Sequence, residues 1–263
     1  MNRFDGRRVL ITGAGSGIGR ATALRLLSEG ATVVGADVSS GGLAATAQAA
    51  ADVAEPDQFV SRAIDIGDEG SVRDGVAFAT EHLGGLDVLV NAAGILRSGH
   101  TEQVTLHEWD QIIRINLTGT FLMIRESLPA LIECGRGVIV NFSSTSASFA
   151  HPYMAAYAAS KGGIQSMTHT IALEFAKQGI RAVSVAPGSI SSGMTSAPGL
   201  PEDSDASLFM KMQPVVRIEN SEPPAIPGMA GPDKVAGVVA MLASDDGAFI
   251  SGTEIRIDGG SHL

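Results

Sequence analysis

The sequence predicts an α/β fold in which one doubly wound parallel sheet of about seven strands carries helices on both faces. Two observations predict it. Short β-branched runs recur along the chain, and longer segments with helical apolar spacing separate them, which is the pattern of βαβ units. In addition, 44% of the 263 residues are apolar and only 17% are charged, so the chain can bury a large core.

The predicted strands are short runs that are rich in Val, Ile and other strand-forming residues. They span residues 8–12, 32–37, 58–65, 87–91, 138–143, 181–186 and 254–257. Most of these runs contain consecutive apolar residues, and this indicates a sheet that is covered on both faces.

The predicted helices fill the intervals between these strands. They span residues 18–29, 41–51, 69–82, 106–133, 157–178 and 233–243. Several are followed by a glycine, where a left-handed residue suits the end of a helix: Gly30, Gly84, Gly135 and Gly179. Because the alternation is unbroken, we place residues 1–263 in a single domain.

One long irregular segment, residues 189–231, follows the sixth predicted strand. It holds six of the eleven prolines and is too long for a simple connection. Its apolar residues are Met194, Leu200, Leu208, Phe209, Met210, Met212, Val215, Val216, Ile218, Ile226 and Met229. We therefore expect this loop to cover a site that binds an apolar small molecule.

The charge and the cysteine content restrict the partners of the protein. The net charge of −10 repels phosphate backbones and anionic lipids, so we expect neither nucleic acid nor a membrane as a partner. Cys134 is the only cysteine, which is typical of a cytoplasmic protein, and no spacing of histidines predicts a metal site. The acidic residues Glu202, Asp203 and Asp205 are interpreted as a solvated part of the loop.

A glycine-rich turn joins the first predicted strand to the first predicted helix. Its sequence from Thr12 to Gly19 is T-G-A-G-S-G-I-G, in which glycines permit a tight turn and let backbone N–H groups approach a pyrophosphate. Asp37 ends the second strand 18 residues after Gly19, where a carboxylate can accept from a ribose diol. The pattern predicts a Rossmann-type dinucleotide site with contacts at Gly13, Ser16, Gly17, Ile18 and Gly19.

Tyr157 and Lys161 are four residues apart on a predicted helix, so their side chains share one face. A lysine ammonium about 4 to 5 Å from the phenol would stabilise the phenolate by about 3 to 4 kcal/mol at an effective dielectric near 20. This corresponds to a lowering of the phenol pKa by roughly two to three units. We therefore predict that Tyr157 transfers protons near neutral pH. Tyr153, the other tyrosine, lacks such a lysine and is interpreted as a packing residue or pocket wall.

Taken together, these motifs resemble the short-chain dehydrogenase/reductase family, in the branch of roughly 250 residues that uses NAD or NADP. The matching features are the T-G-x-x-x-G-x-G turn and the Tyr157-x-x-x-Lys161 pair. Further matches follow in the order of the family: Asn91, Ala92, Ala93 and Gly94 after the fourth strand, then Asn116, Ser144, Pro187 and Gly188. The resemblance covers nearly the whole chain.

The resemblance implies a set of cofactor contacts. Asp65 and Ile66 would flank the adenine, and residues 91–94 would support the central part of the cofactor. Pro187 and Gly188 would border the nicotinamide end, and Ile190 and Ser192 would contact the carboxamide, with Ser192 where the family more often has Thr.

The resemblance also implies the catalytic roles. Tyr157 would exchange the hydroxyl proton, Ser144 would hydrogen-bond the substrate oxygen, Lys161 would hold the nicotinamide ribose, and Asn116 would anchor a water relay to Lys161. Each role has a structural alternative. Ser144 lies in a Ser/Thr-rich stretch and can cap a turn, and Asn116 can satisfy backbone groups inside a helix.

Charge decides between the two forms of the cofactor. Asp37 would repel a 2′-phosphate. The resemblance implies that a member that prefers NADP would have a basic residue at the position of Ser16 or Val38, and neither residue is basic here, so we predict NAD. The predicted function is an NAD-dependent oxidoreductase that interconverts a secondary alcohol and a ketone. A 3-oxoacyl-thioester reductase of the acyl-carrier-protein type and a non-catalytic dinucleotide-sensing protein are the alternatives.

Two predicted helices, 106–133 and 157–178, carry apolar residues on more than one face. Examples in the second helix are Ile164, Met167, Ile171, Leu173 and Phe175. A single contact with the sheet cannot bury them all, so a subunit interface is expected. The family resemblance implies a homotetramer.

Overall fold

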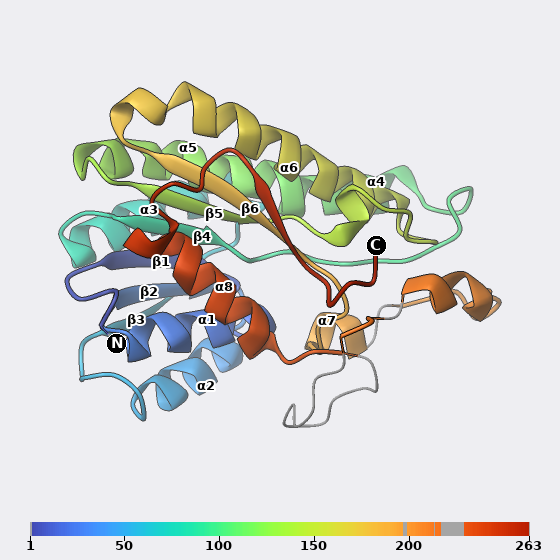
Figure 1. The fold of residues 1–263 in the computed structure, drawn as a ribbon, viewed down its shortest axis with the longest axis horizontal. Coiled ribbons are helices and arrows are strands. Elements are labelled where there is room, and N and C mark those ends of the chain that lie inside the picture. The colour runs from blue at the N-terminus through green and yellow to red at the C-terminus, as the bar shows by residue number, and fades with distance from the viewer. Residues whose placement is uncertain (1, 197–198, 213, 217–228, 263) are drawn as a thin grey trace.

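The structure is a computed structural model that describes residues 2–196, 199–212, 214–216 and 229–262. Seven parallel strands form one sheet in the order β3-β2-β1-β4-β5-β6-β7 (Figure 1). The predicted fold class, a single domain with a doubly wound parallel sheet, is confirmed.

The strands lie close to their predicted positions. They are β1 Arg8–Thr12, β2 Thr32–Asp37, β3 Phe59–Ala63, β4 Val88–Asn91, β5 Val138–Phe142, β6 Arg181–Pro187 and β7 Glu254–Ile257. The largest difference is in β3, which ends two residues before the predicted end at Asp65. There the Asp65 carboxylate accepts from the backbone N–H of Gly67 at 2.8 Å, and this turns the chain away from the sheet.

The helices between the strands also follow the prediction, with one correction. They are α1 Gly17–Ser28, α2 Ser40–Ala50, α3 Glu69–Leu83, α4 Leu106–Ile112, α5 Gly119–Glu133, α6 Ala155–Glu174, α7 Gly193–Ser196 and α8 Pro232–Ala243, with short 3-10 helices at Thr145–Ala147, Ala176–Gln178, Ala206–Met212 and Asp245–Gly247. The predicted regular helix 106–133 is wrong in its centre, because a π-helical turn at Ile113–Thr118 separates α4 from α5.

Both faces of the sheet are covered, as its apolar strands predict. Helices α1, α2 and α8 pack on one face, and α3, α5 and α6 pack on the other (Figure 1). Side chains of β1 alternate between the two layers: Val9 and Ile11 belong to the first core and Leu10 to the second, and all three are fully buried. In the described part of the chain, no helix has the length and apolarity needed to span a membrane.

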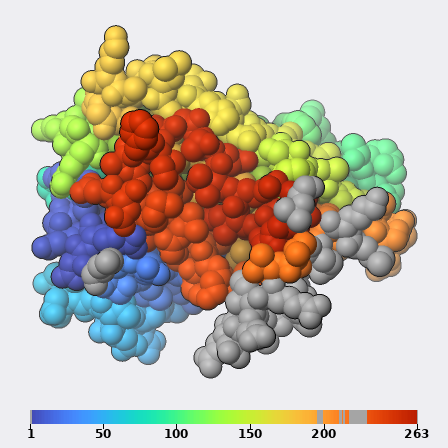
Figure 2. Space-filling view, in the orientation of Figure 1, coloured from blue at the N-terminus to red at the C-terminus, as the bar shows by residue number. Residues whose placement is uncertain are grey.

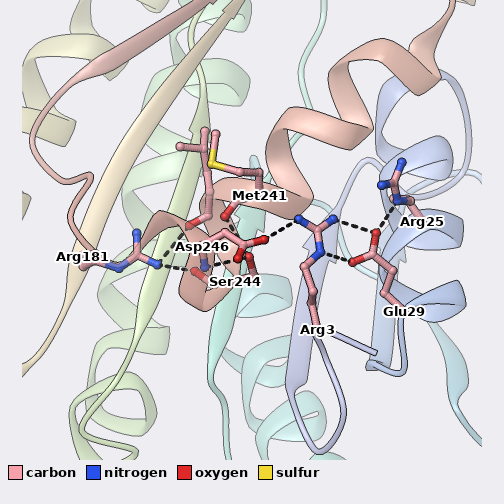
Figure 3. A network of polar contacts seen from close by, with 8 residues as sticks. Arg3, Arg25, Glu29, Arg181, Met241, Ser244 and Asp246 are labelled. Atoms are coloured by element: carbon pink, nitrogen blue, oxygen red, sulfur yellow. Dashed lines mark hydrogen bonds and ion pairs between the residues drawn. The ribbon is translucent and has the colours of Figure 1, made fainter. Parts of the chain in front are cut away.

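The buried carboxylate of Glu29 lies at the amino edge of the sheet, where the strands begin, and is paired with arginines. Arg3 donates to both carboxylate oxygens of Glu29, at 2.6 and 2.7 Å, and to Asp246 at 2.9 Å, while Arg25 also donates to Glu29 (Figure 3). We call Arg3, Arg25, Glu29 and Asp246 the amino-edge network. It ties the N-terminal segment and the end of α1 to the end of α8.

The loop 189–231 is less irregular than predicted. It contains α7 and the 3-10 helix Ala206–Met212, which stands out at the right of Figure 1. Its ends are joined, since Ala230 donates to Ser189 at 3.0 Å and Ser191 donates to Ala230 at 2.9 Å. Of the apolar residues predicted for this loop, Ile218, Ile226 and the Met210 side chain lie outside the described part of the structure.

Candidate active site

A cavity of about 550 Å³ opens at the carboxyl edge of the sheet, where β1 and β4 lead their following helices to opposite faces. Every residue that the motifs assigned to the cofactor or to the reaction lines it, except Asn91 and Asn116. These lining residues are Gly13, Ser16, Gly17, Ile18, Gly19, Asp37, Asp65, Ile66, Ala92, Ala93, Gly94, Ser144, Tyr157, Lys161, Pro187, Gly188, Ile190 and Ser192. The structure thus brings together residues from the carboxyl ends of six strands, β1 to β6. Of the described loop residues that were expected to cover the site, Leu208, Val215 and Val216 do not line the cavity.

The glycine-rich turn leaves the start of α1 open toward this cavity. Gly13 has a left-handed φ of +72°, and a Cβ atom there would lie 2.8 Å from the backbone nitrogen of Ala93. A Cβ on Gly19 would overlap the carbonyl of Gly13. Ser16 precedes the helix, but its side chain makes no capping hydrogen bond. The first N–H groups of α1 are therefore oriented to receive an anion, and this arrangement fits the phosphates of a dinucleotide.

Asp37 is held rigidly at the end of β2. One carboxylate oxygen accepts from the Gly15 N–H and the other from the Ser39 N–H, both at 2.9 Å. These bonds leave lone pairs on both oxygens for further donors. Among the described residues that line the cavity, Lys161 is the only lysine or arginine.

Asn91 lies behind the cavity wall instead of in it. Its side chain donates to Asn141 at 2.9 Å, and Asn141 donates to Thr168 at 2.9 Å. This buried chain of amides joins β4 to β5 and α6. Nearby, the Ala93 N–H donates to the Thr12 hydroxyl at 3.2 Å. The structure therefore does not place Asn91 in the cavity wall, where the family resemblance put a cofactor contact; Asn91 supports the segment that lines the cavity.

Helix α6 presents Tyr157 and Lys161 to the same part of the cavity. Lys161 is 5% exposed, and its ammonium donates to the carbonyl of Phe142 at 2.7 Å and lies 5.6 Å from the centre of the Tyr157 ring. Ser144, at the end of β5, lies next to the Tyr157 side chain and affects its pKa, and the Ser144 hydroxyl accepts from the Ser146 N–H at 3.2 Å. The two interpretations of Ser144, as a cap and as a neighbour of the phenol, are therefore compatible.

The predicted direction of the Tyr157 pKa shift is wrong for this structure. Burial raises the pKa of Tyr157 to about 12, and the hydrogen bond from Ser144 opposes this shift without reversing it. Burial also lowers the pKa of Lys161 to about 8. The sequence argument included the charge of Lys161 but not the loss of water around both groups, which disfavours the phenolate and the ammonium alike.

Asn116 lies in the π-helical turn and is fully buried. Its amide oxygen accepts from the Ile95 N–H at 2.8 Å, and its amide nitrogen donates to the Ile95 carbonyl at 2.9 Å and to the Ser160 hydroxyl at 3.1 Å. These contacts place it against the segment after β4 and one residue from Lys161. The structural alternative for Asn116 is thus confirmed in part, since it satisfies backbone, although of another segment. Its role in a water relay stays a prediction.

Comparisons with known proteins agree with this geometry. The family model described as short chain dehydrogenase matches residues 7–201. The chain belongs to the short-chain dehydrogenase/reductase family.

Three relatives in this family match almost the whole chain. A levodione reductase from Leifsonia aquatica is 37% identical over 264 residues, which cover 98% of this chain and 95% of the relative. A 3-oxoacyl-[acyl-carrier-protein] reductase from Thermotoga maritima is 36% identical and covers 98% of each chain. A cyclohexanol dehydrogenase from an Acinetobacter species is 33% identical, with 98% of this chain and 96% of the relative covered.

Solved structures of short-chain dehydrogenases/reductases superpose over the same length. The structure of levodione reductase has a TM-score of 0.86 at 35% identity and covers 98% of both chains. A 3-ketoacyl-(acyl-carrier-protein) reductase from Brucella melitensis, solved in complex with NADH, has a TM-score of 0.85 at 31% identity and covers 98% of this chain and 99% of that one. The protein is therefore an oxidoreductase of the family that binds a nicotinamide dinucleotide.

His151 is a cavity residue that the sequence argument did not single out. It is partly buried, with one ring nitrogen 3.1 Å from the Phe149 carbonyl and the other 3.2 Å from the Thr145 hydroxyl. A carbonyl only accepts, so the first nitrogen carries the proton. Burial, the largest cause, lowers the pKa of His151 and keeps the ring neutral. Its place six residues before Tyr157 was the one available signal.

Proposed function

We propose that this protein is an NAD-dependent oxidoreductase that interconverts a secondary alcohol and a ketone. One observation carries the proposal: the Tyr157 phenol and the Ser144 hydroxyl lie next to each other and face a cavity that continues to the glycine-rich turn. A carbonyl oxygen placed between these two donors would accept from both. The bound dinucleotide would supply the hydride for reduction or accept it in oxidation.

Tyr157 is suited to donate a proton in the direction of reduction. With a pKa of about 12, the phenol keeps its proton at neutral pH. With a hydride supplied by the dinucleotide, the carbonyl oxygen would take the proton from Tyr157, which would leave an alcohol and a Tyr157 phenolate. Lys161 would stabilise this phenolate, since its ammonium lies 5.6 Å from the ring centre. Proton uptake from water would restore the phenol.

The charge around the cavity favours NAD over NADP. Asp37 can accept from ribose hydroxyls but would repel a 2′-phosphate, and the residues that line the cavity near it include no arginine. We expect kcat/KM to be at least about tenfold higher with NADH than with NADPH. Asp37→Ala should narrow this ratio, whereas equal use of both cofactors by the unchanged protein would contradict the assignment.

The substrate side of the cavity is apolar. Met194, Leu200, Phe209, Met212 and Met229 of the loop 189–231 line it. This wall supports a loop that covers an apolar alcohol or ketone. None of these five loop residues is cationic, and an apolar wall favours a free ketone over a carrier-bound 3-oxoacyl thioester.

The deciding experiment is an assay of NADH consumption with three substrate classes: a short ketone, a cyclic ketone and a 3-oxoacyl thioester. We expect turnover of ketones and little of the thioester. Preference for the thioester would favour the carrier-type reductase. Binding of NADH without turnover of any substrate would favour a non-catalytic dinucleotide-sensing protein.

A homotetramer is proposed on the apolar side chains that α4, α5 and α6 leave exposed. They are Leu106, Trp109, Phe121, Ile132 and Leu173, of which Leu173 is 83% exposed. The part of this expectation that rested on α6 is corrected, because Ile164 and Ile171 are buried in the core of the protein and Met167 and Phe175 pack against it. Light scattering tests the assembly, and a monomeric mass at micromolar concentration would refute it.

A further inference from the structure

Tyr153 has an unusual backbone conformation close to the candidate active site. Its φ of +65° lies in the left-handed region, which bulky residues rarely adopt. Its carbonyl accepts from the Gly99 N–H at 2.8 Å, so this conformation is fixed by a second segment of the chain. Such conformations persist only where several contacts hold them, and they cluster at functional sites.

The side chain of Tyr153 provides these contacts. Its hydroxyl accepts from the backbone N–H of Asp205 at 2.9 Å. Its ring meets His100 edge to face, with ring centres 5.1 Å apart, and is stacked on Phe209 with ring centres 6.2 Å apart. Phe209 in turn lines the cavity. Tyr153 therefore holds the loop segment that carries Phe209 beside the cavity.

His100 makes a second connection to the same loop. Its Nε2 lies 2.9 Å from a carboxylate oxygen of Asp203. The charged groups that act on His100 are Asp203 from the loop and Glu102 from its own segment, and the ring of Tyr153 packs against it.

The loop is also joined to the C-terminal segment, since the N–H of Val215 donates to the carbonyl of Gly259 at 2.9 Å. The two regions lie beside each other in Figure 2.

We infer that Tyr153 and His100 are positioning residues that hold residues 203–209 against the cavity and so set the affinity for the substrate. The inference rests on the proposed function, because it assumes that the apolar wall around Phe209 contacts the ketone. Neither residue touches the reacting atoms. Their effect should therefore fall on KM and leave kcat nearly unchanged.

The contact between His100 and Asp203 makes this effect dependent on pH. The hydrogen bond to Asp203 raises the pKa of His100 above its usual value, so the contact between the two side chains favours the protonated ring. As the pH rises through this pKa, the ion pair becomes a neutral hydrogen bond and residues 203–209 are held less firmly. The pair is exposed to solvent, so we expect KM to rise by about two- to fivefold, and less at high salt.

The first test is Tyr153→Phe, which removes the hydroxyl and keeps the ring. The loss of one hydrogen bond should raise KM for a bulky ketone by about three- to tenfold, with kcat and the dissociation constant of NADH within about twofold. His100→Gln and Asp203→Asn should each abolish the pH dependence of KM. Glu202→Gln, which changes an exposed carboxylate beside Asp203, is the matched control and should preserve that dependence.

The second test is hydrogen exchange in the absence of substrate, which requires no turnover. The N–H groups of Asp205, Ser207 and Leu208 are hydrogen-bonded in the structure, and they should exchange faster in Tyr153→Phe. Faster exchange together with an absence of ketone turnover would support the positioning contact and contradict the proposed function. Ketone turnover with unchanged KM and unchanged exchange would overturn the inference.

Discussion

The two edges of the sheet differ in whether a buried charge has a partner of opposite charge. At the amino edge, the carboxylate of Glu29 is 7% exposed and is bonded to two arginines, Arg3 and Arg25. At the carboxyl edge, Lys161 is 5% exposed and donates to a backbone carbonyl, and it makes no ion pair with any described residue. Both charges are buried, but only one of them has a partner of opposite charge.

This difference sets the direction of the pKa shifts. The hydrogen bond from Arg3 is the largest cause that lowers the pKa of Glu29, so the folded protein favours its charged form. Burial lowers the pKa of Lys161 and raises that of Tyr157, so the folded protein disfavours both charged forms. The amino-edge network therefore stabilises the fold. At the carboxyl edge, buried Lys161 reduces stability at neutral pH, whereas the raised pKa of Tyr157 reduces stability only above about pH 10, where the phenol of the unfolded chain ionises. Buried groups with such shifted pKa values are typical of catalytic sites.

The largest expected effect comes from Tyr157→Phe. This change removes the proposed proton donor and should lower kcat by at least about a hundredfold. The free energy of unfolding should not fall, because a buried hydroxyl is replaced by an apolar ring edge. Measurement of kcat with a ketone, NADH binding and chemical denaturation checks this separation. Near-normal turnover would assign the proton transfer to another residue.

The second prediction concerns Lys161→Met. Burial lowers the pKa of Lys161 in the unchanged protein from the usual 10.5 to about 8, so at neutral pH the buried ammonium costs at most about 3 kcal/mol of stability. The free energy of unfolding of the variant should be about 1 to 3 kcal/mol higher than that of the unchanged protein, measured by urea denaturation at pH 7. The variant should also lose activity. The unchanged protein should gain stability as the pH rises from 8 to 10, whereas the variant should lack this gain. A less stable variant would contradict the comparison.

Much of the fold could be predicted from the sequence, because the signals for it are local. β1, β2 and β7 begin and end at their predicted residues, and the glycine-rich turn lies between strand and helix as its spacing indicates. The spacing of Tyr157 and Lys161 correctly placed both on one side of α6. Adjacent residues decide each of these features.

The features that could not be predicted depend on contacts between distant segments. The π-helical turn contains Asn116, which is bonded to Ile95, 21 residues earlier, and a pattern of apolar residues does not distinguish this turn from an α-helix. The interpretation of Asp203 as solvated was incomplete, since it bonds His100 from 103 residues away. The pKa of Tyr157 depends likewise on which segments exclude water from it.

The third prediction tests the other edge through Glu29→Gln. The substitution removes the charge that Arg3 and Arg25 share, and both arginines keep some access to water, so the loss of stability should be about 1 to 2 kcal/mol. Turnover should be unchanged. Asp74→Asn is the control, because it alters the exposed pair Arg73 and Asp74 and should change stability by less than about 0.5 kcal/mol. Equal losses in both variants would show that burial of the network has no energetic role.

The smallest expected effect is the pH dependence of the stability difference between the unchanged protein and Glu29→Gln. Because Arg3 lowers the pKa of Glu29 in the folded state, the stability that its charge contributes is present above the pKa of the unfolded chain and is lost as the pH falls through the folded pKa. The gap between the unchanged protein and Glu29→Gln should therefore shrink by about 1 kcal/mol between pH 6 and pH 3, measured by urea denaturation. The gap between the unchanged protein and Lys161→Met should stay constant over this range, since Lys161 is protonated in both states there. A constant gap for Glu29→Gln would mean that shape, and not charge, accounts for the loss at the amino edge.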